Sequence, residues 1–169
     1  MSIMSDCFRV GQKAVYPCHG VGTIEDIQQR DIGGFKQDFY VLKIHSTGAK
    51  VMVPTSAART SGLRSVIEEP QVKVIYDILK SPSKRSRATW NRRFRALNDK
   101  LQTGRLEDIA EVLRDLSNLR RDKDLSFGEK KMLEKAREMI VNEISASRGQ
   151  EASSVEIEIN SILKPTLDL

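Results

Sequence analysis

The stretch AKVMVPTSAARTSGLRSVIEEPQVKVIYDILK, residues 49–80, contains the point at which the sequence pattern changes. Up to Pro54, β-branched residues are concentrated between turn residues, which is typical of a strand. Beyond Glu68 the apolar residues recur at helical spacing, and they are Val72, Ile75, Ile78 and Leu79. Ser65 and Glu68 have the spacing of a capping box, which predicts that a helix begins after them. The stretch therefore predicts a β part followed by an α part.

On the N-terminal side of this stretch, short apolar runs are separated by turn residues. The expected strands are KAVYP (13–17), VGTIEDIQQRDI (21–32), QDFYVLKIH (37–45) and AKVMVP (49–54). Gly33-Gly34 and Ser46-Thr47-Gly48 predict the turns of two hairpins. Four or five strands within about 50 residues form only a small antiparallel barrel or a tight sheet.

On the C-terminal side, three further segments have helical spacing. They are residues 90–103, 106–121 and 125–144, and Gly104 stands where the first of them would stop. Ser126 and Glu129 have the spacing of a second capping box. The stretch VEIEIN, residues 155–160, fits both a strand and a helical face, and we favour a short, weakly held helix because helical segments precede it.

The composition excludes several classes of protein. Hydrophobic residues make up 39% of the 169 residues and charged residues 30%, which excludes a disordered chain. No apolar run approaches the roughly 20 residues of a membrane span, so we expect a soluble protein. The N-terminus MSIMSDCFRV lacks the basic start and apolar run of a signal peptide. We expect a cytoplasmic protein in which Cys7 and Cys18 remain reduced.

Residues with catalytic or metal-binding chemistry are sparse. His19 and His45 have no partner at a metal-ligand spacing, and Cys18-His19 has no C-x-x-C to complete a site. HGVGTIED, residues 19–26, has Glu25 at the third glycine position of a dinucleotide fingerprint and continues into a strand. Neither a phosphate-binding loop nor a nucleophile elbow occurs in the sequence. We expect no enzyme activity, no metal and no cofactor.

The formal net charge of +5 is distributed unevenly. Residues 81–105 contain eight basic residues against Asp99 alone, whereas residues 149–169 contain four acidic residues against Lys164. Residues 1–70 are close to neutral, which favours a protein partner for the β part. The basic segment is either a solvated helix face or an electrostatic footprint for nucleic acid, and we favour the second because other helices mix charges.

The single tryptophan, Trp90, lies within this basic segment, in ATWNRRFRAL (88–97). Most tryptophans pack in a core, which is one interpretation. Its neighbours Arg92 and Arg93 cannot be buried with it without leaving unpaired charge. The alternative is that the arginines hold phosphates while the ring presses against bases, and we favour it. Charge and composition alone leave open whether the nucleic acid is DNA or RNA.

In the β part, the last expected strand ends in Pro54. Proline is tolerated at sheet edges, so this strand is either an edge that accepts a partner strand or merely a protected edge. The sequence alone leaves both interpretations open.

Seven stretches together resemble the CarD/CdnL family of bacterial transcription regulators. They are FRVGQKAVYPCHGVGTIEDI (8–27), DFYVLKI (38–44), VMVP (51–54), GLR (62–64), TWNRRFR (89–95), IAEVLRDL (109–116) and LSFGEKKML with a following Ala136 (125–136). The similarity covers residues 8–148. The glycine hairpin alone is less specific, because the polymerase-interacting module of the transcription-repair coupling factor shares it.

The resemblance implies a fold and a domain organisation. The fold class is α+β, with a small N-terminal Tudor-like antiparallel β-barrel followed by an all-α helical domain. We expect an RNA polymerase-interacting domain at residues 1–62, a DNA-contacting domain at 63–148, and a variable acidic tail at 149–169.

The resemblance also implies a non-catalytic function. The protein would bind the RNA polymerase β subunit and stabilise the promoter open complex, as a monomer associated with the bacterial nucleoid through the polymerase and without a membrane contact. Trp90 would insert into the minor groove at the upstream edge of the bubble, reading shape more than sequence. The remaining implied DNA contacts are Arg92, Arg93, Arg95, Arg85 and Arg87. The implied polymerase contacts are Arg30, Ile32, Met52 and Pro54, and Met52 stands where some relatives have arginine.

Two rival functions remain open at this stage. One is a stand-alone regulator with a helix-turn-helix in residues 106–133, although Phe127, Gly128 and Glu129 are poor base readers. The other is a protein-only adaptor in which the basic segment is incidental.

Overall fold

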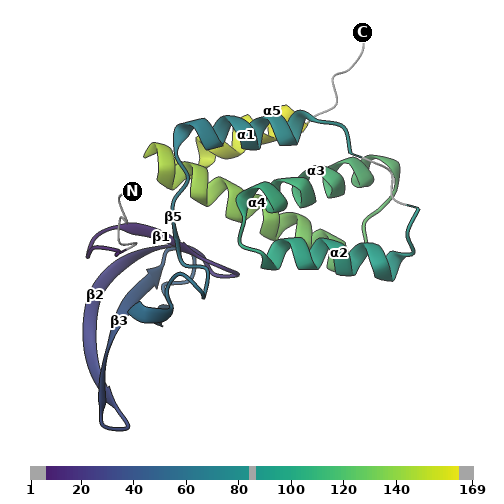
Figure 1. Ribbon diagram of the computed structural model, residues 1–169. Helices are drawn as coiled ribbons and strands as arrows, with labels where there is room; N and C mark the ends of the chain where they lie inside the picture. The colour runs from purple at the N-terminus through teal and green to yellow at the C-terminus, as the bar shows by residue number, and fades with distance from the viewer. Residues whose placement is uncertain (1–6, 84–86, 164–169) are drawn as a thin grey trace, which may run out of the picture. The chain divides into compact units, whose positions relative to one another are not determined.

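The computed structural model describes residues 7–83 and 87–163 (Figure 1). The chain divides into two compact units, the first ending at Val66 and the second beginning at Ile67. The buried apolar residues form two separate clusters, one in each unit. The predicted α+β class is confirmed, since the first unit contains the strands and the second the α-helices.

The first unit is a five-stranded antiparallel sheet. Its strands are β1 (Lys13–Tyr16), β2 (Gly20–Ile32), β3 (Phe35–Ile44), β4 (Lys50–Pro54) and β5 (Arg64–Ser65), in the order β4-β3-β2-β1-β5. A 3-10 turn, η1 (Thr55–Ala57), follows β4. The four expected strands are confirmed. A fifth strand was allowed for but not located, and it is the short β5, so the first unit continues beyond residue 62.

The β2–β3 hairpin is the longest feature of the sheet. Gly33 and Gly34 connect the strands with φ values of 59° and 85°, and two positive φ angles are what a type I′ turn requires. β1 pairs with β2 only from Gly20 to Thr23, and β4 pairs with β3 only from Phe39 to Lys43. The part of the hairpin nearest the turn is therefore a two-stranded ribbon.

The second unit is a bundle of α1 (Glu69–Lys80), α2 (Trp90–Gln102), α3 (Leu106–Asp122), α4 (Phe127–Arg148) and α5 (Ala152–Leu163). Helix α3 packs against α1, α2 and α4, and α5 packs against α1 and α4 (Figure 1). The fully buried centre includes Ile109, Leu113, Ile140 and Ile144, as expected from the apolar spacing of α3 and α4. None of the helices in the described part is long and apolar enough to cross a membrane.

The two predicted capping boxes have different outcomes. The Ser126 and Glu129 box is confirmed at the start of α4, where the Glu129 backbone N–H donates to Ser126 Oγ at 3.2 Å. The Ser65 and Glu68 box is wrong. Ser65 belongs to β5 and pairs with Ala14, while Glu68 is itself the N-cap of α1 and its N–H donates to Gln71 Oε1 at 2.8 Å.

The VEIEIN stretch lies in helix α5, and this helix is firmly attached. Val155 and Ile159 are completely buried in the helical core. Tyr76 of α1 donates its hydroxyl to Glu158 Oε2 at 2.7 Å, and Arg148 of α4 lies 3.2 Å from the same oxygen. Burial and the hydrogen bond to Glu158 raise the pKa of Tyr76 to about 12. The helix expected to be weakly held thus contributes to the core.

Candidate nucleic-acid interface

Trp90 is the first residue of α2, and its side chain is anchored but not enclosed. The residue is 45% exposed. Its ring stacks on Phe94, one turn later, with 5.1 Å between ring centroids and 22° between planes. Its indole Nε1 donates a hydrogen bond to Glu129 Oε1 on α4 at 3.3 Å. One edge of the indole is therefore held in a defined position while the rest of the ring contacts solvent.

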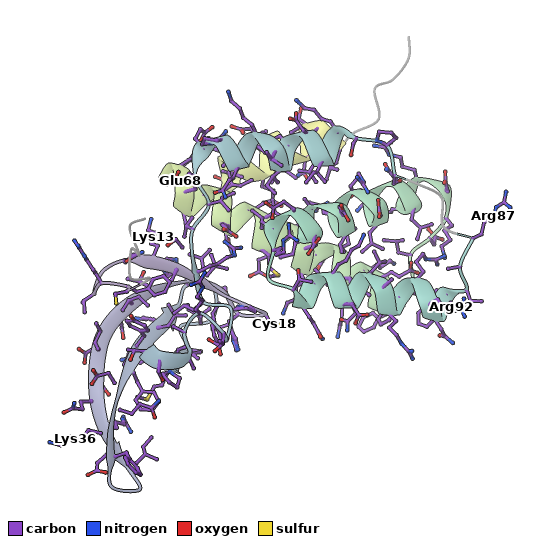
Figure 2. The ribbon with its side chains drawn as sticks, viewed as in Figure 1. Lys13, Cys18, Lys36, Glu68, Arg87 and Arg92 are labelled. Atoms are coloured by element: carbon purple, nitrogen blue, oxygen red, sulfur yellow. The ribbon has the colours of Figure 1, made fainter. Side chains whose placement is uncertain are left out.

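The arginines near Trp90 divide into exposed and partly buried ones. Arg87, Arg92 and Arg95 are exposed, and Figure 2 shows Arg87 and Arg92 near the start of α2. Arg93 is half-buried, with Nη2 3.6 Å from Glu129 Oε2. Arg85 lies outside the described residues. The N-cap Thr89 makes no side-chain hydrogen bond to the first turn, and a helix N-terminus favours anions such as phosphate.

Glu129 lies directly beneath this surface and connects α4 to α2. It is only 1% exposed, and its Oε1 accepts hydrogen bonds from the Ser126 N–H and from Trp90. Lys123 Nζ lies 3.8 Å from the same oxygen. Burial alone would raise the pKa of the Glu129 carboxyl, but the hydrogen bonds from Ser126 and Trp90 and the charge of Lys123 lower it. The carboxylate is therefore kept ionised below the indole.

Gly128 allows the aromatic stack to approach α4. A Cβ added at this glycine would lie 2.8 Å from Cε2 of Phe94, which is closer than real Cβ contacts. Phe94 therefore fills the space that a side chain at residue 128 would need. The sequence alone gives no sign of this requirement, because Gly128 and Phe94 are 34 positions apart.

Phe127, the first residue of α4, is a second exposed aromatic near this surface. It is 75% exposed, and Lys131 Nζ lies 4.5 Å from its ring centroid. From the sequence, Phe127 was interpreted only as a poor base reader. A large exposed apolar side chain with a cation above it is nevertheless suited to contact an anionic polymer.

On the sheet, the ladder register places the four expected polymerase contacts on one face. Arg30 pairs with Gln37, Ile32 with Phe35, and Met52 with Val41. Pro54 pairs with Phe39, and residues opposite each other in a ladder share a face, as do alternate residues of a strand. Tyr40, Leu42 and Val53 occupy the other face, which is the core face. We call the face of Arg30, Ile32, Met52 and Pro54 the outer face.

The outer face combines apolar side chains with polar ones, and Gln28 and Gln37 lie on it beside Arg30. Ile32 and Phe35 are exposed, and Phe39, Met52 and Pro54 are half-buried. Arg30 is exposed, and its Nη2 lies 3.4 Å from Gln28 Oε1 on the same face.

The described residues contain no cluster of three or more histidines, cysteines or carboxylates suited to a metal ion.

The sequence matches two family models, which together cover most of the chain. Residues 8–67 match the model described as the CarD-like/TRCF RID domain, and residues 74–160 match the CarD, C-terminal domain. A protein of Bacillus subtilis (strain 168), named "Putative transcription factor YdeB", is 34% identical over 142 residues, which is 84% of this chain and 93% of that protein. A solved structure described as "CdnLNt from Myxoccoccus xanthus" is 39% identical, covers 41% of this chain and 97% of that one, and has a TM-score of 0.33.

Proposed function

Because the chain belongs to the CarD/CdnL family of transcription factors, we propose that it binds RNA polymerase through its sheet unit and stabilises the promoter open complex through Trp90. In this proposal the sheet unit contacts the polymerase β subunit. Trp90 contacts the minor groove at the upstream edge of the transcription bubble. The protein acts as a monomer without catalysis.

The observation that carries the proposal is the anchored but exposed indole of Trp90. A hydrogen bond to a buried carboxylate and a stack on Phe94 restrict the ring before any contact with DNA. A restricted side chain loses little conformational entropy on binding, so its contacts contribute more to affinity. Arg92 and Arg95 are exposed on the same helix as the ring and are available for phosphates.

The physical chemistry favours action at a distorted site in the promoter. Partial unstacking of a base step costs a few kcal/mol, and the cost is smallest where the duplex is already melted. Attachment of the sheet unit to the polymerase raises the local concentration of DNA near the helical unit. A helical unit with few phosphate contacts can therefore act there even if its affinity for free DNA is low.

The outer face of the sheet supports the polymerase contact. Its exposed Ile32 and Phe35 are apolar side chains of the kind that form interface cores, and Arg30 adds a charge at their edge. The near-neutral charge of residues 1–70 fits a protein surface better than a polyanion.

The proposal is tested by measuring the lifetime of open complexes that RNA polymerase forms on a linear promoter fragment. For Trp90→Ala, we expect polymerase binding to be unchanged and the lifetime to fall about 5- to 150-fold, which corresponds to about 1–3 kcal/mol of lost base stacking. Val74→Ala is a matched control, because Val74 of α1 is exposed to the same degree, 46%, and lies outside the site. We expect this variant to retain the wild-type lifetime.

A folded Trp90→Ala variant with the wild-type lifetime would contradict the role of the indole. Loss of polymerase binding in the same variant would instead place Trp90 at the protein interface. Trp90→Phe separates the ring from its N–H group, and we expect an intermediate lifetime because a smaller, unanchored ring remains.

The helix-turn-helix alternative has no support at the start of α4. Glu129 is buried beneath Trp90, and Gly128 packs against Phe94. Neither residue is available to read base edges in a major groove.

A further inference from the structure

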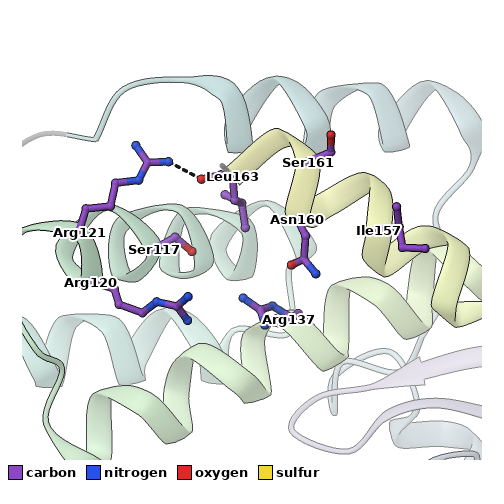
Figure 3. Close-up of a pocket in the computed structure, with 8 residues that line it drawn as sticks. All are labelled: Ser117, Arg120, Arg121, Arg137, Ile157, Asn160, Ser161 and Leu163. Carbon is purple, nitrogen blue, oxygen red and sulfur yellow. Dashed lines mark hydrogen bonds between the residues drawn. The ribbon is translucent and has the colours of Figure 1, made fainter. Parts of the chain in front are cut away.

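A surface pocket with a volume of about 530 Å³ lies among α3, α4 and α5 (Figure 3). All three helices belong to the helical unit. The residues that line the pocket are Ser117, Arg120, Arg121, Arg137, Ile157, Asn160, Ser161 and Leu163. None of the functions discussed above uses this pocket.

The pocket concentrates positive charge. Arg120 and Arg121 lie in the last turn of α3 and Arg137 lies on α4, and Figure 3 shows the side chains of Arg120 and Arg137 reaching toward one another. All of its other described lining residues are uncharged. Guanidinium groups that face each other without a carboxylate repel, and a bound anion would remove that repulsion.

The carboxylates of α5 are directed elsewhere. Glu158 accepts the hydroxyl hydrogen bond of Tyr76 and lies next to Arg148. Glu156 lines a different pocket, together with Glu134, Glu138 and Asn142, and Arg137 borders both pockets. The residues that line the α3–α4–α5 pocket itself include no carboxylate.

Two buried polar atoms at the pocket have no hydrogen-bond partner among the described residues. They are Oγ of Ser117 and Nε of Arg137. Leaving a buried polar group unsatisfied is costly, so such atoms are uncommon in folded proteins. A hydroxyl and a guanidinium N–H can both donate to an anionic oxygen, and a ligand oxygen in the pocket would satisfy them.

The other polar groups suit an extended anion with several oxygens. Arg121 donates to the carbonyl oxygen of Leu163 at the end of α5, which positions its guanidinium at the rim. Asn160 of α5 adds a neutral amide donor directed toward Arg137 (Figure 3). Guanidinium forks bind phosphate oxygens in pairs, so arginines on two helices can each contact a different phosphate of one ligand.

We propose that the α3–α4–α5 pocket binds a small ligand with two or more linked phosphates, of the diphosphate or triphosphate class. The volume lies in the range of small-molecule sites. The unsatisfied atoms are buried, so a small free anion can reach them more readily than the backbone phosphates of a stiff duplex can. The inference is independent of the function proposed for Trp90.

The test is calorimetric titration of the full-length protein with pyrophosphate at fixed ionic strength. We expect saturable binding of one pyrophosphate per chain. For Arg120→Gln/Arg137→Gln, we expect the dissociation constant to rise about tenfold or more, since two charge-assisted contacts are lost. Lys130→Gln removes one charge from an exposed position of α4 outside the pocket, and we expect a change of less than about twofold.

A second pair of variants controls for the possibility that the double variant binds less pyrophosphate only because it misfolds. Asn160→Asp places a negative charge in the pocket with almost no change in shape, and we expect it to weaken pyrophosphate binding as strongly as the double variant. Asn98→Asp adds the same charge at an exposed position of α2, and we expect wild-type binding.

Three results would overturn the proposal. They are the absence of saturable pyrophosphate binding to the wild type, wild-type affinity in Asn160→Asp, and displacement of pyrophosphate by duplex DNA that depends on Arg120 and Arg137. The last result would assign the pocket to the DNA-contacting surface. Because open-complex lifetime is not the readout, failure here leaves the proposal for Trp90 unaffected.

Discussion

Glu129 connects two helices through one buried carboxylate. It completes the capping box of α4 with Ser126 and accepts the indole N–H of Trp90 from α2. A capping box stabilises a helix end locally, whereas the indole contact orients a side chain that is 39 residues away in sequence. The position of Trp90 therefore depends on the ionisation of a residue that never reaches the surface.

This dependence gives a prediction for acidic pH. Because the folded-state pKa of Glu129 is below the ordinary value of 4.5, its contribution to stability is complete above that value and is lost as the pH falls through the folded-state pKa. Trp90 is the single tryptophan, so we expect its emission to change as the pH falls below 4.5 and through the folded-state pKa of Glu129.

Glu129→Gln and Glu134→Gln form a matched pair for this measurement. Glutamine at 129 does not titrate, so the acid transition of the emission should disappear, whereas Glu134 is exposed on the same helix and its variant should retain the transition. An unchanged transition in Glu129→Gln would assign the titration to another group.

At the level of single residues, the sequence indicated Trp90 and its arginines but missed Glu129 as their partner. An aromatic residue within a basic segment is visible in composition. A hydrogen bond between helices is not, because local spacing predicts only the cap. Arg93 illustrates the same limit, since the sequence placed it with Arg92 and the structure holds it near Glu129.

At the level of elements, the contact between α2 and α4 depends on Gly128. Glycine-to-alanine changes within helices usually stabilise a protein. Here the new Cβ would meet the Phe94 ring at 2.8 Å, so we expect Gly128→Ala to destabilise the protein by about 1–3 kcal/mol in urea unfolding.

A double-mutant cycle checks the cause of this loss. In a Phe94→Ala background the ring is absent, and Gly128→Ala should then cost nothing or be slightly stabilising. An equal loss in both backgrounds would show that Phe94 is not the obstacle.

The β2–β3 hairpin allows a sharp test of its two faces. Arg30 lies on the outer face, whereas Lys36 pairs with Asp31 on the opposite face of the same ribbon. We expect Arg30→Glu to weaken polymerase binding about tenfold or more, since a like or unpaired charge at an interface is costly, and Lys36→Glu to leave it nearly unchanged.

Pull-down of RNA polymerase with each full-length variant provides the measurement. Equal retention of polymerase by both variants would remove the outer face from the interface. Stronger loss in Lys36→Glu would place the interface on the opposite face of the ribbon.

Helices, strands and turns were predictable from the sequence where the residues that determine them lie within one short stretch. Gly33-Gly34 indicated the β2–β3 turn, and Gly104 indicated the end of α2. The capping box at Ser65 was wrong because that residue pairs with Ala14, which is 51 positions earlier, and local spacing contains no information on such pairing. The VEIEIN stretch was ambiguous because Val155 and Ile159 belong both to its alternating pattern and to its helical face.

At the level of the whole molecule, each unit has a separate core, and α5 belongs to the helical one. Ile159 is completely buried there, while Ile157 on the same helix is 70% exposed. We expect Ile159→Ala to destabilise the helical unit by about 2–5 kcal/mol, and Ile157→Ala to change stability by less than about 0.5 kcal/mol.

Hydrogen exchange resolved by residue distinguishes the two units in this experiment. Amides of α1, α4 and α5 should lose protection in Ile159→Ala, whereas those of β2 and β3 should not, because the two apolar clusters share no member. Equal loss of protection in the sheet would mean that the units unfold together.

Separate cores also affect how such a chain can diverge. A substitution that alters packing in one half leaves the other half's interior unaffected, so each half can accumulate changes at its own rate and under its own selection. We therefore expect the junction between Val66 and Ile67 to tolerate the joining of either half to an unrelated sequence, with that half's interior retained.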